Sequence, residues 1–237
     1  MTDQSEIPDP GAPLPTGAAK ATAVRSMFDS IAPRYDLVNR IMTFRLDIRW
    51  RKRTVQSLAL PVNSKVLDLA CGTGDLCRDL QSASHHPIGM DLSWGMLAAA
   101  QVDAPLVHTD ALQLPVADGS IDGVTCGFAL RNFTGLEPFL NEMVRVLRSG
   151  GRIALLEVDR PLNPLLRVGH SLYFGRIVPL VGGLLSNRNA YRYLPRSVAY
   201  LPPEGELLAT IEAAGFTDVV KNRCSGGIAQ LLTATRI

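Results

Sequence analysis

Residues 66–75 read Val-Leu-Asp-Leu-Ala-Cys-Gly-Thr-Gly-Asp, and the rest of the chain is best understood from this stretch. Residues 65–70 form an apolar run, which predicts a buried parallel strand. Two glycines follow, one residue apart, and a helical pattern begins at Asp75. This order predicts a strand, a tight turn and a helix N-terminus, where a ligand can approach the backbone closely. Asp68 lies inside the apolar run, where a carboxylate needs a partner.

Such a turn is typical of the binding sites of two kinds of nucleoside cofactor. The dinucleotide fingerprint G-x-G-x-x-G requires a third glycine at position 77, which is occupied by Cys77. The alternative is an acid just before the turn and a second acid at the end of the next strand, and Asp68 and Asp91 fit it. Asp91 closes the candidate strand 87–91, where a carboxylate suits the two hydroxyls of a ribose. A tight turn in an unrelated α/β protein stays open as an explanation of these residues alone.

The spaced acids and the glycine turn resemble class I S-adenosylmethionine-dependent methyltransferases. Residues 64–157 alternate between strand and helix patterns, which predicts a mostly parallel, doubly wound α/β sheet with helices on both faces. Two more strands near the C-terminus would add a hairpin and complete the seven-stranded, Rossmann-like pattern of these enzymes. The expected strands are 65–70, 87–91, 105–108, 121–126, 151–157, 217–222 and 228–235, and the expected helices are 75–83, 93–101, 136–148 and 204–214.

Ligands of such sheets bind beyond the carboxyl ends of the strands. That rule brings the predicted cofactor-binding residues to one rim: Asp68, Gly72, Thr73, Gly74, Asp91, Asp110, Ala111 and Gly127. Asp110 would suit the adenine region, although it fits equally well as a turn residue. Glu157 and Asp159 end the fifth strand on the same rim, so either could face substrate. Gly150 and Gly151 are expected to cap the preceding helix.

Composition excludes several classes of protein. Of the 237 residues, 46% are hydrophobic and 19% charged, and the net charge of +2 gives no overall field that would attract nucleic acid. The four cysteines form no C-x-x-C motif, so we expect reduced, intracellular cysteines and no metal site. Without an apolar run long enough to span a bilayer, the expected location is the cytoplasm, and contact with the inner membrane surface stays open.

Three segments lie outside the predicted sheet. Residues 1–22 are rich in Pro, Gly and Ala and are expected to form a disordered tail before a single domain at 23–237. Residues 23–60 read as a helical cap whose basic run at 45–53 is either a solvated helix face anchored by Trp50 or a surface for anionic lipid. Residues 161–200 combine apolar and basic residues and read as a lid or as a plain helical layer.

Five further motifs together resemble the ubiquinone/menaquinone biosynthesis C-methyltransferase family. The resemblance runs from about Val24 to Ile237 and keeps the order of every element. The motifs are Tyr35-Asp36-x-x-Asn39 followed by Thr43 and Trp50, Phe128-Ala-Leu-Arg-Asn-Phe133, the segment 145–157, Ala190-Tyr-Arg-Tyr-Leu194, and Gly226-Gly-Ile-Ala229.

The resemblance implies methyl transfer from S-adenosylmethionine to a ring carbon of a reduced, prenylated quinone, and demethylmenaquinol fits best. We expect Arg131 to stabilise the phenolate, Asn132 to orient the ring and Tyr35 to close over the cofactor. An arginine is a poor base, so its expected role is electrostatic. A salt bridge for Arg131 and core packing for Tyr35 remain the plain alternatives.

Departures from the family pattern leave the acceptor open. Arg196 and Leu232 stand where relatives usually have other residues, so a phylloquinone-type quinol or a polyketide or other aromatic acceptor is an alternative. A dehydrogenase is disfavoured by Cys77, and an inactive scaffold by the complete set of Asp68, Gly72 and Asp91. The fourth strand is followed by neither an Asn/Asp-Pro-Pro-aromatic segment nor a Pro-Cys nucleophile, which disfavours nucleic-acid substrates. The expected partner is a lipophilic quinol, and a homodimer is left open.

Overall fold

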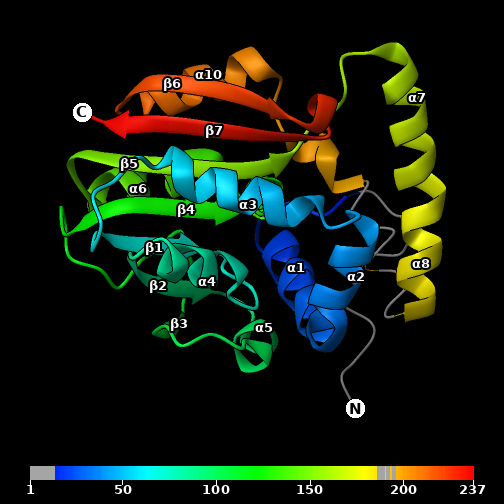
Figure 1. Cartoon of the computed structure of the whole chain (residues 1–237), viewed down its shortest axis with the longest axis horizontal. Helices are drawn as coiled ribbons and strands as arrows, with labels where there is room; N and C mark the ends of the chain where they lie inside the picture. The colour runs from blue at the N-terminus through cyan, green and yellow to red at the C-terminus, as the bar shows by residue number, and fades with distance from the viewer. Residues whose placement is uncertain (1–13, 186–189, 191–192, 194–195) are drawn as a thin grey trace.

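A seven-stranded sheet forms the centre of the computed structural model (Figure 1), which describes residues 14–185, 190, 193 and 196–237. The strand order is β3-β2-β1-β4-β5-β7-β6; the first five strands are parallel and β7 runs antiparallel between β5 and β6. This arrangement confirms the predicted fold class. The strands are β1 Lys65–Leu69, β2 His86–Asp91, β3 Leu106–His108, β4 Ile121–Gly127, β5 Leu147–Val158, β6 Phe216–Cys224 and β7 Ala229–Arg236.

Both faces of the sheet are buried, and residues 153–156 of β5 show why this part of the strand is continuously apolar. Successive side chains of a strand point to opposite faces. Ile153 and Leu155 therefore join the cluster beneath α6 (Leu136–Val146) and α10 (Glu204–Ala213), whereas Ala154 and Leu156 join the cluster beneath α3 (Leu46–Ser57) and α4 (Asp75–Ser82). Helix α5 (Trp94–Ala99) follows β2.

Two groups of helices lie beyond the carboxyl ends of the parallel strands, at the right in Figure 1. The first comprises α1 (Gly17–Ile31), η2 (Ala32–Arg34) and α2 (Tyr35–Met42); the second comprises α7 (Pro164–Leu172), the π-helical turn η4 (Tyr173–Ile177) and α8 (Val178–Leu185). Met27, Val38 and Val178 belong to one buried cluster, so the two groups pack together. The Tyr173 hydroxyl also donates to the Met42 carbonyl at 2.8 Å.

The predicted cap of residues 23–60 divides between two places. Helices α1 and α2 lie over the strand ends, but α3 packs on the face of the sheet, where Trp50 and Val55 are buried. Arg49, Lys52 and Arg53 of the basic run are exposed on the other side of α3. The exposure of these residues is compatible with both interpretations of the run, a solvated helix face anchored by Trp50 and a surface for anionic lipid.

Two predicted boundaries differ from the structure. Helix α1 begins at Gly17 rather than Ala23, because Lys20 is buried and its Nζ donates to the Phe133 carbonyl at 2.7 Å. A helix cap at Gly150 and Gly151 is wrong as well: α6 ends at Val146, and β5 begins at Leu147, which pairs with Ile121 across an irregularity in the ladder. Within the described ranges, every helix is too short or too polar to span a bilayer. The remaining short helices are η3 Leu130–Asn132, η5 Val198–Tyr200 and η6 Ser225–Gly227.

Candidate active site

The turn between β1 and α4 has the backbone that its glycines predict. Ala70, Gly72 and Gly74 all have positive φ, at 52°, 57° and 82°. A Cβ on Gly74 would lie 2.6 Å from the Val102 side chain, so this position requires glycine. A Cβ on Gly72 would meet only Tyr35, at 3.9 Å, which shows that the Gly72 backbone faces open space.

Asp91 fastens this turn to the end of β2. Its Oδ2 accepts a hydrogen bond from the Gly72 N–H at 2.7 Å, and its Oδ1 accepts one from the Ser93 N–H at 2.8 Å. Burial raises the pKa of Asp91, while these two backbone bonds act in the opposite direction. Each carboxylate oxygen keeps a second lone pair, so Asp91 is able to accept bonds from two ligand hydroxyls as well.

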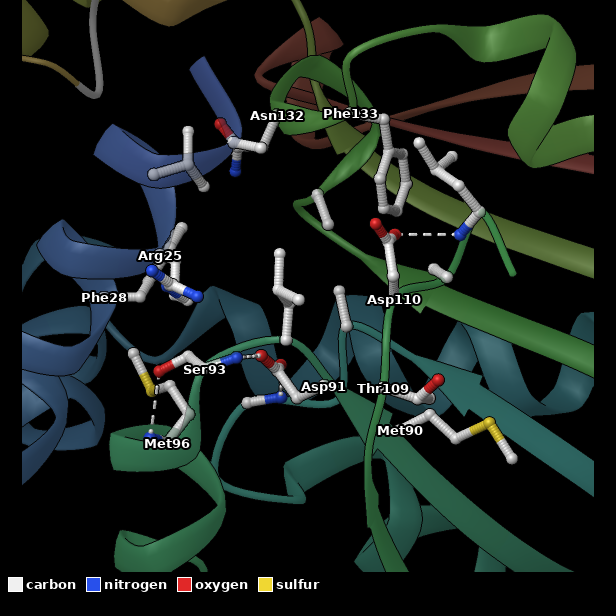
Figure 2. A pocket seen from close by; sticks show the side chains of 18 of the residues that line it. Arg25, Phe28, Met90, Asp91, Ser93, Met96, Thr109, Asp110, Asn132 and Phe133 are labelled. Carbon is white, nitrogen blue, oxygen red and sulfur yellow. Dashed lines mark hydrogen bonds between the residues drawn. The ribbon is translucent and has the colours of Figure 1, made fainter. Parts of the chain in front are cut away.

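A cavity of about 100 Å³ lies over the ends of β1, β2 and β4, and Figure 2 shows its lining side chains. We call it the inner cavity. Five of the eight predicted cofactor residues line it: Gly72, Asp91, Asp110, Ala111 and Gly127. The Asp110 carboxylate accepts from the Leu112 N–H at 2.9 Å, so Asp110 acts as a turn residue and a cavity wall at once.

Helix α1, the first part of the expected cap, contributes a wall of the inner cavity whose residues the sequence did not identify. Val24, Arg25 and Phe28 line the cavity from this helix. Asp29 fixes the helix in place, because its Oδ1 accepts from the Ser93 hydroxyl at 2.6 Å and from the Gly95 N–H at 2.8 Å. The helical spacing of Val24 and Phe28 was visible in the sequence, but it did not identify what their face covers.

Asn132 also belongs to the inner cavity, although we expected it beside the acceptor ring. Its Oδ1 accepts from the Tyr193 hydroxyl at 3.4 Å, and its Nδ2 has no hydrogen-bond partner among the described residues. The residue is only 8% exposed. Leaving a buried N–H unpaired is costly, which is typical of a group that awaits a ligand.

A second cavity of about 410 Å³ adjoins the first, and we call it the outer cavity. The two cavities share six lining residues: Phe28, Tyr35, Ala70, Gly72, Gly127 and Phe128. Phe128 has a positive φ of 60°, which is strained for an aromatic residue and places it between the cavities. A small group held in the inner cavity at this shared wall would face the outer one.

Arg131 lines the outer cavity and takes part in the salt bridge that the sequence left open as an alternative. Its Nη1 pairs with Glu157 and also donates to the Phe128 carbonyl, and its Nε donates to the Ser197 hydroxyl at 3.0 Å. None of these bonds uses Nη2. Glu157 is fully buried against Arg131 and Asp159 pairs with Lys221, and neither lines the inner or the outer cavity, so their position gives no support to a contact with substrate.

Asp68 and Thr73 line the outer cavity, whereas Gly74 lines neither. The Asp68 carboxylate accepts from the Thr125 hydroxyl at 2.8 Å and from the Cys77 thiol at 3.5 Å. Burial raises the pKa of Asp68 to about 7 against the effect of both bonds. The Thr73 hydroxyl donates to Asp36 at 2.6 Å, which ties the turn to α2.

Tyr35 lies on the wall that both cavities share. Burial raises the pKa of its phenol, so the hydroxyl stays protonated at neutral pH. Its ring meets the Phe28 ring edge-on, with 6.0 Å between centroids. Both the expected closure over a cofactor and the alternative of core packing are compatible with this position.

These groups fit S-adenosylmethionine. The glycine turn leaves room for a close backbone approach, and Asp91 has free lone pairs for the ribose hydroxyls. Asn132 offers an unpaired N–H in the same cavity. Asp68 adds a carboxylate that lines the adjoining outer cavity.

Comparison with known proteins agrees with this geometry. The model of the ubiE/COQ5 methyltransferase family matches residues 16–236. A demethylmenaquinone methyltransferase of Roseiflexus sp. is 42% identical over 231 residues, which cover 94% of this chain and 97% of the relative. The ubiquinone/menaquinone biosynthesis C-methyltransferase UbiE of Syntrophotalea carbinolica is 39% identical over 221 residues, 90% of this chain and 93% of that protein.

Solved structures of distant sequence share the fold. A SAM-dependent methyltransferase from Thermotoga maritima superposes with a TM-score of 0.64 at 18% identity, over 90% of this chain and 99% of that chain. At such low identity the likeness supports the architecture of the sheet and its helices, not the choice of acceptor.

Proposed function

The chain belongs to the ubiE/COQ5 methyltransferase family, and from this premise we propose that it methylates a ring carbon of demethylmenaquinol to give menaquinol. It is an S-adenosylmethionine-dependent C-methyltransferase of the menaquinone/ubiquinone type. The observation that carries the choice of acceptor is the outer cavity. It is large and mainly apolar, and it meets the inner cavity along a shared wall.

The inner cavity would hold the cofactor. Asp91 would accept from the ribose hydroxyls, Asp110 and Ala111 would border the adenine, and Asp68 would face the charged amino-acid arm. Asn132 lines this cavity, so we assign its N–H to the cofactor rather than to the acceptor ring. When bound, S-adenosylmethionine supplies a methyl group activated by a sulfonium.

The outer cavity would hold the acceptor. Trp50, Leu166 and Phe174 give it an apolar lining that suits a naphthoquinol ring and the first units of a prenyl tail. Positioning the ring carbon at near-attack distance, about 3–3.5 Å, from the methyl group is the main contribution that a protein makes to such a transfer.

Arg131 would stabilise the charge that makes the ring carbon nucleophilic. A quinol carbon gains nucleophilicity when the neighbouring hydroxyl loses its proton. A guanidinium is a poor general base, so Arg131 would act on the phenolate oxygen by electrostatics and not as the base. Its pairing with Glu157 fixes the guanidinium plane and leaves Nη2 for the phenolate.

Leu232 does not choose the acceptor. The residue is fully buried in β7 and lines neither cavity, so this departure from the family pattern bears on core packing. The walls of the outer cavity, including Thr43, Phe44 and Leu165, are the residues that would discriminate between a naphthoquinol and a benzoquinol.

A direct assay tests the proposal. The protein is incubated with S-adenosylmethionine and, in separate reactions, with demethylmenaquinol, a ubiquinol precursor and a tailless aromatic phenol, and the products are analysed by mass spectrometry. We expect the highest kcat/KM for demethylmenaquinol. Cofactor binding without methylation of any quinol would contradict the proposal, and preference for the ubiquinol precursor would reassign the acceptor. We also propose that the enzyme works at the inner surface of the membrane, where a prenylated acceptor resides.

A further inference from the structure

The exposed large apolar side chains of this protein are concentrated at one place. Ten of the fourteen that the described residues expose lie in residues 37–44 and 162–180, which we call the apolar lip. Phe44 is 73% exposed, Val168 69% and Leu172 52%. Scattered single residues of this kind are ordinary, but a concentrated group marks a surface that contacts something apolar.

The two halves of the lip are joined, and together they surround the outer cavity. The Phe44 ring lies against the Tyr173 ring, with 5.6 Å between centroids, and the Tyr173 hydroxyl binds the Met42 carbonyl. Phe44, Leu165 and Leu166 are exposed and line the outer cavity as well. Figure 1 shows α2 beside the continuous run of α7 and α8. The lip is therefore the rim through which an apolar chain would leave the cavity.

The charge of the lip is of one sign. Residues 37–44 and 162–180 contain three arginines, Arg40, Arg167 and Arg176, and no aspartate or glutamate, in a chain whose net charge is only +2. Arg167 and Arg176 of the lip are exposed, and so is Arg45, which follows Phe44 in the sequence. Among the described residues, Arg167 donates hydrogen bonds to backbone carbonyls and to no carboxylate.

This charge decides between two occupants. A second copy of the chain, related by a two-fold axis, would set the arginines of one lip against those of the other with no carboxylate of the lip between them. An anionic lipid surface complements both properties, because it takes up the apolar side chains and attracts the arginines. We propose that the apolar lip docks on an anionic bilayer, so that the acceptor ring enters the outer cavity while its tail stays in the lipid.

This inference rests on the proposed function only for the identity of the acceptor. Vesicle binding tests the docking of the apolar lip without any acceptor. The full-length protein is sedimented with vesicles of phosphatidylcholine alone or mixed with phosphatidylglycerol. We expect binding to the mixed vesicles that weakens with added salt. Val168→Glu/Leu172→Glu should weaken it about tenfold or more, because two apolar contacts are lost and two negative charges are added. Arg167→Glu/Arg176→Glu should act in the same direction.

Val62→Glu is the matched control. Val62 is 67% exposed, lies before β1 and lines neither cavity, so its substitution should leave vesicle binding unchanged. Unchanged binding of the Val168→Glu/Leu172→Glu variant would overturn the proposal. Equal binding of the wild-type protein to neutral and anionic vesicles would overturn the assignment of anionic lipid. A dimer in gel filtration that this variant converts to a monomer, without vesicle binding, would assign the lip to a second copy instead.

An activity comparison separates this inference from the proposed function. With a tailless quinol in solution, the Val168→Glu/Leu172→Glu variant should match the wild-type rate, because neither residue lines a cavity. With a long-tailed quinol embedded in anionic vesicles, its rate should fall by about the loss in vesicle binding. If the wild-type protein binds vesicles but methylates neither quinol, the proposed function fails and the docking surface stands. Equal rates of both proteins on the embedded quinol would contradict the docking role.

Discussion

At the scale of single residues, two aspartates of the site differ because their surroundings differ. Asp91 is held by two backbone N–H groups, which favour its charged form and leave lone pairs for hydroxyl groups. Asp68 is fully buried, its hydrogen-bond partners among the described residues are a hydroxyl and a thiol, and burial raises its pKa to about 7. Asp91 is therefore suited to a neutral ribose, and Asp68 to a cationic group that would favour its ionised form.

Removing the Asp91 carboxylate should weaken cofactor binding. Asp91→Ala loses charge-assisted bonds to the ribose and releases the Gly72 N–H, so we expect a Kd about 100-fold higher by calorimetry. Asp91→Asn keeps part of the geometry and should lose less. Asp103→Ala, at an exposed position that lines neither cavity, serves as the control. An Asp91→Ala variant with wild-type affinity would remove Asp91 from the site.

Cofactor affinity should depend on pH through Asp68. Because its pKa in the free protein is about 7, Asp68 is protonated below that pH, and a cationic ligand must displace the proton. Binding of S-adenosylmethionine should therefore strengthen as the pH rises toward 7 and then level off. Asp68→Asn should abolish this rise and bind more weakly above pH 7. A wild-type affinity that falls with rising pH would show that Asp68 does not act on the cofactor.

Arg131 should affect the rate of transfer more than cofactor binding. Arg131→Ala would leave Glu157 buried without its partner, which destabilises proteins by about 3–5 kcal/mol, so Arg131→Lys is the better test. Lysine keeps the charge but lacks the planar pair of donors, and kcat should fall about 100-fold or more. A thermal melt and a cofactor titration check that the fold and the inner cavity persist. Full activity of this variant would leave Arg131 a structural residue.

At the scale of elements, local sequence patterns predict those helices, strands and turns that depend only on neighbouring residues. The β1 strand, the glycine turn and α4 follow from apolar runs and turn residues, and the structure has them within one or two residues. The position of α1 could not be predicted this way. It depends on Lys20 reaching Phe133, 113 positions away, and on Asp29 reaching Ser93. The ends of α6 and β5 shifted for the same reason, since pairing of Leu147 with Ile121 overrides the local glycine signal.

The position of α1 predicts protection from a protease. Because α1 covers the inner cavity, a ligand there should hold the helix closed and slow tryptic cleavage after Arg25. At a ligand concentration 100 times Kd, the opening equilibrium shifts by about 100-fold. Mass spectrometry of the fragments with and without S-adenosylhomocysteine measures the effect, and cleavage after Arg53 on α3 is the internal control. Equal rates at Arg25 would show that α1 does not close over the ligand.

At the scale of the whole molecule, the direction of the parallel strands fixes the edge of the sheet at which the active site lies. Five parallel strands end on one side, and the two helical groups convert that edge into two joined cavities and one apolar lip. The cofactor side could be predicted from spaced acids and glycines, because these acids lie at or near the carboxyl ends of strands of known direction. The acceptor side could not, since the outer cavity is lined by segments of α2, α3, α7 and η4 that only the folded chain brings together.

The central claim is that a methyl group passes across the shared wall of the two cavities to a prenylated quinol. The most direct measurement supplies S-adenosylmethionine with a labelled methyl group to demethylmenaquinol and to the same compound in its oxidised form. Label should appear on the ring carbon of the reduced compound alone, and Arg131→Lys should slow its appearance. Cofactor binding with no label in the quinol, or equal labelling of the oxidised form, would contradict the claim.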